Sequence, residues 1–327
     1  MTDLVTFGEA MIRLSPPAQR RLEQTTELDV TVGGAELNVA GGAARLGLTT
    51  SWVSCLPDNP LGRMARNRAR EFGIDVSHVR IVPDARMGLY FVEYGASPRP
   101  SSVLYDRANS AFSELVAGSF DWPTILAGAR AFHTSGITTA LSSAAAAEVE
   151  HALRATRSAG ALTSYDLNFR GKLWTPDEAR RVQEPLMDLV DVLVTTEEDA
   201  GTVFGVTGDD YASVARALAD RFGFRVVTIT IRGDTSVTHN TWTAIAFAGG
   251  TVVDDRTYDI DLVDRVGGGD AYASGFLYGM LTGDVAKAVR YGDAASALQQ
   301  TMWGDLTYAT LPEVERLLAG GGTRIQR

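Results

Sequence analysis

A glycine-rich segment near the carboxyl end has the residue types that phosphate chemistry requires. It reads Asp264-Arg-Val-Gly-Gly-Gly-Asp270, and apolar residues at helical spacing follow it: Phe276, Leu277, Met280 and Leu281. Glycines let the backbone approach a phosphate closely, and a helix start offers free N–H groups and a positive dipole end. Asp270, in the first turn, could take a proton from a substrate hydroxyl as a phosphoryl group arrives. A capped helix start has the same pattern, so the segment alone leaves both interpretations open.

Polar residues also follow three predicted strands in the second half of the chain. These strands cover 162–165, 191–195 and 225–231, and the segments after them are Asp166-Leu-Asn168-Phe-Arg170, Thr196-Glu-Glu-Asp199 and Arg232-Gly-Asp234. Ligands of open α/β sheets bind at the carboxyl ends of the strands, which favours a binding site here. Carboxylates after a strand can also simply cap the next helix.

The elements that must position these residues alternate between strand and helix from about residue 129 onward. Residues 4–8 and 131–135 are predicted as further strands. Ser142 can cap an alanine-rich helix that runs toward Ser158 and stops at Gly160, and helix starts are expected at Thr175-Pro176 and at 310–312. This alternation predicts the α/β class, with a central, mostly parallel sheet flanked by helices. Earlier extended segments, among them 86–94 and 101–105, do not alternate with helices in this way. They predict a small separate sheet.

Composition excludes several classes of protein. The 327 residues carry a formal charge of −10 without a cluster of basic residues, which argues against nucleic-acid binding. No window is apolar over the roughly 20 residues of a membrane span, and no signal peptide is recognised. Cys55 is the only cysteine, so we expect a cytoplasmic protein.

Common catalytic motifs are missing from the sequence. It contains no G-x-x-x-x-G-K-[ST] segment, no G-x-G-x-x-G after the first strand and no G-x-S-x-G. The four histidines, His78, His133, His151 and His239, do not have the spacing of metal ligands. These absences leave the glycine segment as the leading candidate for chemistry.

Two segments at opposite ends of the chain together resemble a known family. Gly33-Gly34-x-x-x-Asn38-x-Ala40 and Asp264-x-x-Gly267-x-Gly269-Asp270 resemble the two signatures of ribokinase-like (PfkB-type) carbohydrate kinases. Within that family the chain looks most like 2-keto-3-deoxygluconate kinases, on the evidence of Gly8-Glu-Ala-Met, Tyr105-Asp-Arg-Ala-Asn-Ser-Ala111 and Asp166-Leu-Asn-Phe-Arg170 in addition to the two signatures. The resemblance covers nearly the whole chain in the right order.

The resemblance implies a fold, an activity and partners. The fold would be one ribokinase-like kinase domain over residues 1–327, with a small β-sheet lid formed by segments of about 9–32 and 86–107. The activity would be ATP-dependent phosphorylation of the terminal hydroxyl of 2-keto-3-deoxygluconate or its galacto epimer. ATP and Mg²⁺ would be required, and the protein would form a homo-oligomer through the lid.

The resemblance also assigns roles to residues of this chain. Asp270 would be the base, and the N–H groups of Gly267, Gly268 and Gly269 would form the anion hole. The substrate would be bound by Gly34, Asn38, Tyr90, Tyr105, Arg107, Arg170 and Asp305. The nucleotide would be bound by Asn168, Thr230, Arg232, Gly233 and Asp293. The metal ligands stay open, with Glu198 and Asp199 as candidates that act through water. The arginines favour a sugar acid, because a guanidinium matches a carboxylate.

Two departures from the family pattern keep other functions open. Thr195-Thr-Glu-Glu-Asp199 lacks the asparagine common before the family's metal-handling glutamate, and segment 234–239 departs from the usual nucleotide loop. A fructokinase or a nucleoside kinase is the alternative within the family. Outside it, a non-catalytic sugar-binding regulatory protein would fit the altered loop, although such a protein has no use for a base beside an anion hole.

Overall fold

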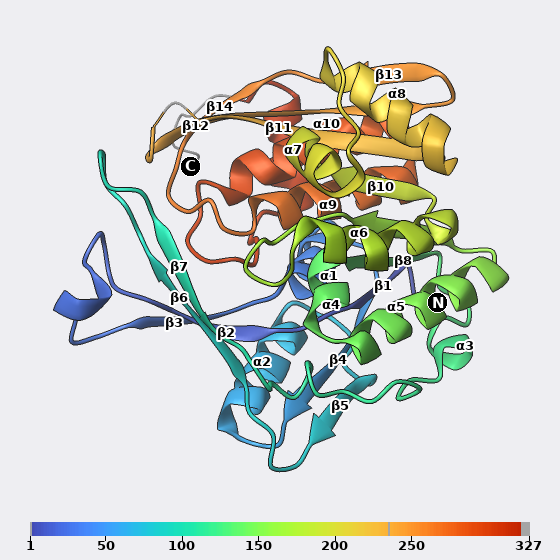
Figure 1. Cartoon of the computed structure of the whole chain (residues 1–327). Helices are drawn as coiled ribbons and strands as arrows, with labels where there is room; N and C mark the ends of the chain where they lie inside the picture. Colours follow the sequence, from blue (N-terminus) through green and yellow to red (C-terminus); the bar gives the residue numbers. More distant parts are fainter. Residues whose placement is uncertain (1, 235, 322–327) are drawn as a thin grey trace.

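The structure is a computed structural model that describes residues 2–234 and 236–321. Within these ranges the chain forms a large ten-stranded sheet covered by helices and a second, four-stranded sheet (Figure 1). The predicted α/β class with a mostly parallel central sheet and a separate small sheet is therefore confirmed. No helix in the described ranges is both long enough and apolar enough to span a bilayer.

The large sheet is parallel over most of its width. Seven parallel strands lie in the order β11-β10-β9-β8-β1-β4-β5, and β12 continues the sheet antiparallel to β11, with β13 and β14 both paired to β12. The strands are β1 (Leu4–Phe7), β4 (Thr50–Pro57), β5 (Val79–Val82), β8 (Ala131–Ser135), β9 (Leu162–Asp166), β10 (Val192–Thr195), β11 (Val226–Asp234), β12 (His239–Ala248), β13 (Thr251–Asp254) and β14 (Tyr258–Asp261).

The small sheet comes from the early extended segments. Its order is β3-β2-β6-β7, with β2 parallel to β6 and the other two pairs antiparallel. The strands are β2 (Met11–Ser15), β3 (Asp29–Gly33), β6 (Gly88–Glu93) and β7 (Ser102–Asp106), and a short 3₁₀ turn, η1 (Leu22–Gln24), joins the first two. Figure 1 shows this sheet projecting from the body of the molecule, on the left of the view.

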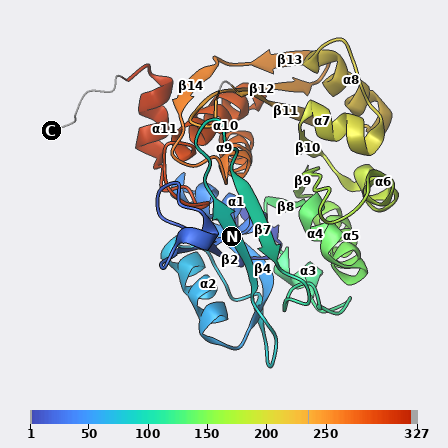
Figure 2. The ribbon, with the colours of Figure 1, turned by 60° about the vertical axis from the view of Figure 1, so that its left-hand side comes forward.

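Helices cover both faces of the large sheet, and each face has its own apolar core. One core contains residues of α3 (Trp122–Ile125), α5 (Ser143–Ser158), α6 (Pro176–Gln183) and α8 (Tyr211–Phe222). The other contains residues of α1 (Ala35–Arg45), α9 (Gly268–Thr282), α10 (Val285–Gln299) and α11 (Leu311–Leu318). Figure 2 shows these two groups on opposite sides of the strands. The remaining helical elements are α2 (Pro60–Glu71), α4 (Gly136–Leu141), η2 (Glu184–Leu189), α7 (Glu197–Asp199) and η3 (Ala200–Phe204).

The predicted helix boundaries are confirmed at their caps. Ser142 accepts a hydrogen bond from the backbone N–H of Ala145, and Gly160 adopts the left-handed conformation just beyond the last turn of α5. Thr175 forms a capping box with Glu178 at the start of α6. Short local signals were sufficient here because a cap involves only neighbouring residues.

One strand is longer than the sequence indicated. The predicted strand 225–231 continues to Asp234, so Arg232 and Gly233 lie on β11 and not in a loop after it. They pair with Trp242 and Thr241 of β12, and this hairpin extends the strand. The predicted nucleotide segment 234–239 is covered only in part, because Thr235 and the side chain of Asp234 lie outside the described residues.

The helix that begins at the glycine segment is held by close packing. A Cβ on Gly275 would lie 2.4 Å from the carbonyl oxygen of Tyr291, and one on Gly279 would lie 2.3 Å from the Cα of Ala288. These glycines let α9 and α10 approach backbone to backbone. The start of α9 is therefore fixed by a rigid helix pair in the core.

Candidate active site

A cavity of about 330 Å³ lies where the strand ends, two helix starts and the small sheet meet. Its walls include Asp166 at the end of β9, Thr195 at the end of β10 and Thr230 on β11. The first residues of α1 and α9 also line it, and the small sheet covers it with residues of β2, β6 and β7. The position agrees with the rule that ligands bind at the carboxyl ends of parallel strands.

Most of the predicted site residues line this cavity although they are far apart in the chain. Those that line it are Gly34, Asn38, Tyr90, Tyr105, Arg107, Asn168, Arg170, Asp199, Thr230, Arg232, Gly267, Gly269, Asp270 and Asp305. Those that are not among its walls are Glu198, Gly233, Gly268 and Asp293. The roles assigned to all these residues stay predictions, but the geometry brings most of them to one place.

The glycine segment forms the start of α9 as expected. Gly267 is the N-cap with φ +84°, and a Cβ there would lie 2.2 Å from the carbonyl oxygen of Asp305, so only glycine fits. Asp270 follows in the first turn, where it accepts a hydrogen bond of 2.7 Å from the Nδ2 of Asn38. The first N–H groups of a helix have no intrahelical acceptor, so this end of α9 can bind an anion beside a carboxylate.

Burial raises the pKa of several carboxyl groups in the cavity. The pKa of Asp270 is raised to about 6 by burial, while its hydrogen bond to Asn38 acts in the opposite direction. Asp166 is raised further, to about 8, by burial and by the charges of Asp270 and Asp199. A carboxyl with a pKa near 6 is a stronger base than an ordinary aspartate and is still ionised at neutral pH.

Two amide oxygens in the cavity wall lack a hydrogen-bond partner among the described residues. Within residues 2–234 and 236–321, the Oδ1 atoms of Asn38 and Asn168 are buried without a hydrogen bond. Both side chains use their Nδ2 on a carboxylate, Asn38 on Asp270 and Asn168 on Asp166. Because buried acceptors are normally satisfied, these two atoms suit a ligand that brings hydroxyl or amino hydrogens.

The two arginines expected to meet a substrate carboxylate are in different environments. Arg107 donates from both Nε and Nη2 to one carboxylate oxygen of Glu9, and Ser110 donates to the other oxygen of that carboxylate. Arg170 is exposed, and the hydrogen bond that the structure gives it goes to the carbonyl oxygen of Phe169. The charge of Arg107 is thus already compensated, whereas within the described residues Arg170 makes no ion pair and has further donors for a ligand carboxylate or phosphate.

The residues predicted to bind the nucleotide are split between the cavity and the core. Arg232 lies with its guanidinium 5.3 Å from the ring centre of Trp242, whose Nε1 donates to Asp293 over 3.0 Å. Asp293 is fully buried and also accepts from the backbone N–H of Ala244. Instead of reaching the cavity, Asp293 fixes the ring against which Arg232 lies.

The residues expected to handle a metal fit only an indirect role. Asp199 faces the cavity and accepts a hydrogen bond from the backbone N–H of Phe169, and Glu198 is exposed outside it. No cluster of three or more His, Cys, Asp or Glu side chains in the described part of the chain could hold a metal ion directly. Mg²⁺ bound through waters and substrate phosphates needs few protein ligands, so Asp199 suits such a site.

Sequence reasoning missed two buried charged residues, one in the cavity wall and one behind it. Glu36, in the first turn of α1, lines the cavity at 1% exposure and accepts hydrogen bonds from Ser135 and Thr138. Arg13 is 1% exposed and binds both Asp264 and Asp305. The usable signal for Arg13 was a single charged residue inside the apolar run Met11-Ile-Arg13-Leu14.

The chain is similar in sequence to known carbohydrate kinases. Residues 1–305 match the model of the pfkB family carbohydrate kinases. The chain is 43% identical over 326 residues to a 2-dehydro-3-deoxygalactonokinase of Haloferax volcanii, covering 99% of each protein.

Solved structures of carbohydrate kinases are also similar to this chain. A crystal structure of 2-dehydro-3-deoxygluconokinase from Thermotoga maritima has a TM-score of 0.94 and 43% identity, with 98% of each chain covered. An E. coli protein assigned as ribokinase II, crystallised with ATP and Mg²⁺, has a TM-score of 0.86 at 21% identity and covers 98% of this chain and 100% of its own. At that identity the last comparison supports the fold alone.

Replacement of Glu36 by glutamine tests the electrostatics of the cavity. Burial raises the pKa of Glu36 from 4.5 to about 7, so the folded state holds this proton more tightly than the unfolded state. The stability from this group is complete below the unfolded pKa and is lost as pH rises through 7. Glu36→Gln does not titrate, so its free energy of unfolding relative to wild type should improve by about 2–3 kcal/mol from pH 5 to pH 8.

Urea unfolding of both proteins at the two pH values measures this change. The glutamine keeps an oxygen that can accept from Ser135 and Thr138, which makes it a matched replacement. An equal difference between the two proteins at pH 5 and pH 8 would show that Glu36 does not titrate in this range.

Proposed function

The chain belongs to the pfkB family of carbohydrate kinases, and on this premise we propose that it phosphorylates a 2-keto-3-deoxy sugar acid with ATP. The acceptor is the terminal hydroxyl of 2-keto-3-deoxygluconate or its galacto epimer. The observation that carries the proposal is the position of Asp270, one residue after the glycines that begin α9 and in contact with Asn38.

The proposed reaction moves one phosphoryl group and one proton. The sugar oxygen bonds to the γ-phosphorus of ATP as the bond between that phosphorus and the oxygen of the leaving ADP breaks. Asp270 takes the hydroxyl proton. The N–H groups of Gly267, Gly268 and Gly269 meet the charge on the transferring phosphoryl group, where fixed donors lower the barrier.

Nucleotide and metal are assigned to the side of the cavity formed by β9, β10 and β11. Thr230 and Arg232 face it, and with Asn168 and Gly233 they are the proposed ATP contacts. Mg²⁺, when bound, would neutralise phosphate charge, and Asp199 would hold it through water. Asp293 is proposed to act behind Trp242 instead of touching the adenine.

The sugar acid is assigned to the side covered by the small sheet. Tyr90 and Tyr105 are stacked with ring centres 6.0 Å apart and line the cavity with Gly34. Arg170 is the better carboxylate ligand of the two arginines, since Glu9 already engages Arg107. Relatives named as kinases of 2-dehydro-3-deoxy sugar acids, at 43% identity over nearly the full length, support this substrate class.

The small sheet is the proposed lid of a single kinase domain spanning residues 1–327. It covers the cavity with Met11, Tyr90, Val103 and Tyr105. Its strands expose Val30 and Leu104, which are 48% and 59% accessible. Exposed apolar residues of this kind suit the proposed contact between lids in a homo-oligomer.

A coupled assay of ADP formation with a substrate panel tests the proposed function. The panel holds 2-keto-3-deoxygluconate, 2-keto-3-deoxygalactonate, fructose, ribose and adenosine. We expect the highest kcat/KM for one of the two keto acids. Faster turnover of fructose or adenosine than of either acid would replace the sugar-acid assignment.

Replacement of Asp270 tests the proposed base. Asp270→Asn should lower kcat by about 10²–10⁴-fold, the usual contribution of a positioned base, while sugar binding survives. In wild type, kcat/KM should fall as pH drops below about 6, because burial raises the pKa of Asp270 to about 6 and the protonated acid cannot act as base. Asp188→Asn, at an exposed position, is the control. An unchanged kcat in Asp270→Asn would exclude this residue as the base.

Alanine variants of Arg170 and Arg107 should have different effects, the first on KM for the substrate and the second on stability. Arg170→Ala should raise KM for the sugar acid by about 10- to 100-fold and leave KM for a neutral sugar nearly unchanged, since one charge-assisted hydrogen-bonding group is lost. Arg107→Ala should instead lower the melting temperature, because it removes the positive charge paired with Glu9, which is 4% exposed. Equal effects of Arg170→Ala on acid and neutral sugars would assign that residue to the nucleotide.

A further inference from the structure

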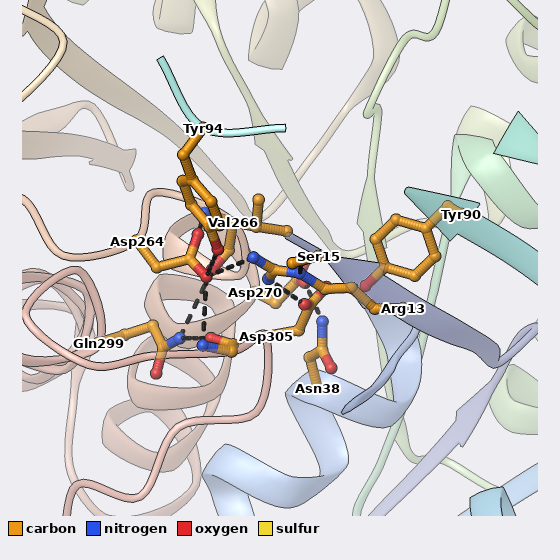
Figure 3. Close-up of polar contacts among 11 residues, drawn as sticks. Arg13, Ser15, Asn38, Tyr90, Tyr94, Asp264, Val266, Asp270, Gln299 and Asp305 are labelled. Carbon is orange, nitrogen blue, oxygen red and sulfur yellow. Dashed lines mark hydrogen bonds and ion pairs between the residues drawn. The ribbon is translucent and has the colours of Figure 1, made fainter. Parts of the chain in front are cut away.

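Arg13 is a buried arginine of the small sheet whose guanidinium binds two carboxylates of the large domain. Its Nη2 donates to Asp264 and its Nη1 to Asp305, each over 2.6 Å, and its Nε donates to Ser15. Figure 3 shows both carboxylates pointing at the guanidinium from segments on either side of it. Arg13 lies on β2, whereas its two partners are 251 and 292 residues further along the chain.

Both aspartates also contact the glycine segment or the turn before it, Asp264 through its carboxylate and Asp305 through its backbone. Asp264 accepts hydrogen bonds from the backbone N–H groups of Val266 and Gly304, which fixes the turn directly before Gly267. The backbone of Asp305 packs on Gly267, where a Cβ would lie 2.2 Å from its carbonyl oxygen. The start of α9 therefore lies between two segments that Arg13 ties together.

Two tyrosines complete the network from the small sheet. Tyr94 donates to Asp264 over 2.5 Å, and its ring centre lies 5.5 Å from the guanidinium of Arg13. Tyr90 pairs with Arg13 across β2 and β6 and donates to Asp305. Since Tyr90 also lines the cavity, the network reaches from the proposed sugar side to the glycine segment.

Arg13 also compensates the negative charges of its two partners. Asp264 and Asp305 are 1% and 5% exposed, so in the absence of Arg13 two buried negative charges would flank the place where a phosphate must bind. Burial by itself would lower the pKa of Arg13, but the carboxylates of Asp305 and Asp264 outweigh burial and raise it. Arg13 therefore stays charged and leaves the anion-binding end of α9 its positive field.

We propose that Arg13 is a positioning residue for phosphoryl transfer. By bridging Asp264 and Asp305 from the small sheet, it sets the position of the Gly267–Gly269 N–H groups and couples that sheet to the anion hole. The proposal rests on the proposed function. Arg13 is not among the residues that line the cavity, so it acts through its two partners rather than on the substrate.

A double-mutant cycle on kcat tests the proposal. Arg13→Met and Asp264→Asn should each lower kcat by about 10- to 100-fold, the scale of a misplacement of about 1 Å, with KM for the sugar changing less than kcat. The double variant should be no slower than the slower single variant, because both changes break one unit. Multiplication of the two single effects, or an unchanged kcat in both, would overturn the proposal.

Further variants separate geometry from charge and from folding. Arg13→Lys should stay about as slow as Arg13→Met, because one ammonium group cannot reproduce the guanidinium bridge; wild-type kcat in Arg13→Lys would overturn the proposal. Arg99→Met is the matched control, since Arg99 ties together parts of the small-sheet region through Glu93 and Gln19, and kcat should stay within about twofold of wild type. If Arg13→Met does not fold, the kcat of Asp264→Asn alone tests the proposal, because Arg13 still forms its ion pair with Asp305 in that variant.

The substrate panel keeps this question separate from that of the proposed function. Failure of the sugar-acid assignment would appear in the wild-type protein as a preference for another sugar. The cycle is then measured with the sugar that wild type phosphorylates, and its outcome still decides the role of Arg13.

Discussion

The hydrogen bond between Asn38 and Asp270 joins two helix starts that are 232 residues apart in the chain. It can form because α1 and α9 cross closely on one face of the sheet, where a Cβ on Gly42 would lie 2.3 Å from the Oγ of Ser274. The crossing brings the first residues of both helices to the wall of one cavity. The positions of the proposed base and anion hole depend on this crossing, which makes it the central constraint of the molecule.

Several carboxyl groups lie close together in the wall of the cavity. Burial raises the pKa values of Glu36, Asp166 and Asp270. The charge of Asp270 raises the pKa of both Glu36 and Asp166 further, and the charge of Glu36 raises that of Asp166. A site for phosphates needs positive charge to balance these groups. The helix starts, Arg170 and Arg232 supply part of it, and a divalent cation bound with the nucleotide would supply more. With this balance the proposed sugar acid could bind although carboxylates lie so close.

The small sheet is more than a cover in this arrangement. Its residues reach the cavity directly through Tyr90 and Tyr105, and indirectly through the ion pairs that Arg13 makes with Asp264 and Asp305. Burying a charged pair is costly unless every donor and acceptor is satisfied, and the network around Asp264 meets this requirement with four donors: Arg13, Tyr94, Val266 and Gly304. A well-satisfied network of this kind holds two parts of a molecule in one relative position.

The sequence by itself determined the fold class, the family and most of the residues that line the cavity. Local signals suffice for the strands and helix caps, because these depend on neighbouring residues, whereas the family and the site residues followed from the resemblance of two signatures at opposite ends of the chain. Only the tertiary structure decided which charges are compensated. It showed that Glu9 holds Arg107, that Asp293 lies behind Trp242, and that Arg13 bridges two distant carboxylates. Such pairs depend on side chains hundreds of residues apart meeting in a buried place where water cannot screen them, and no local pattern encodes that meeting.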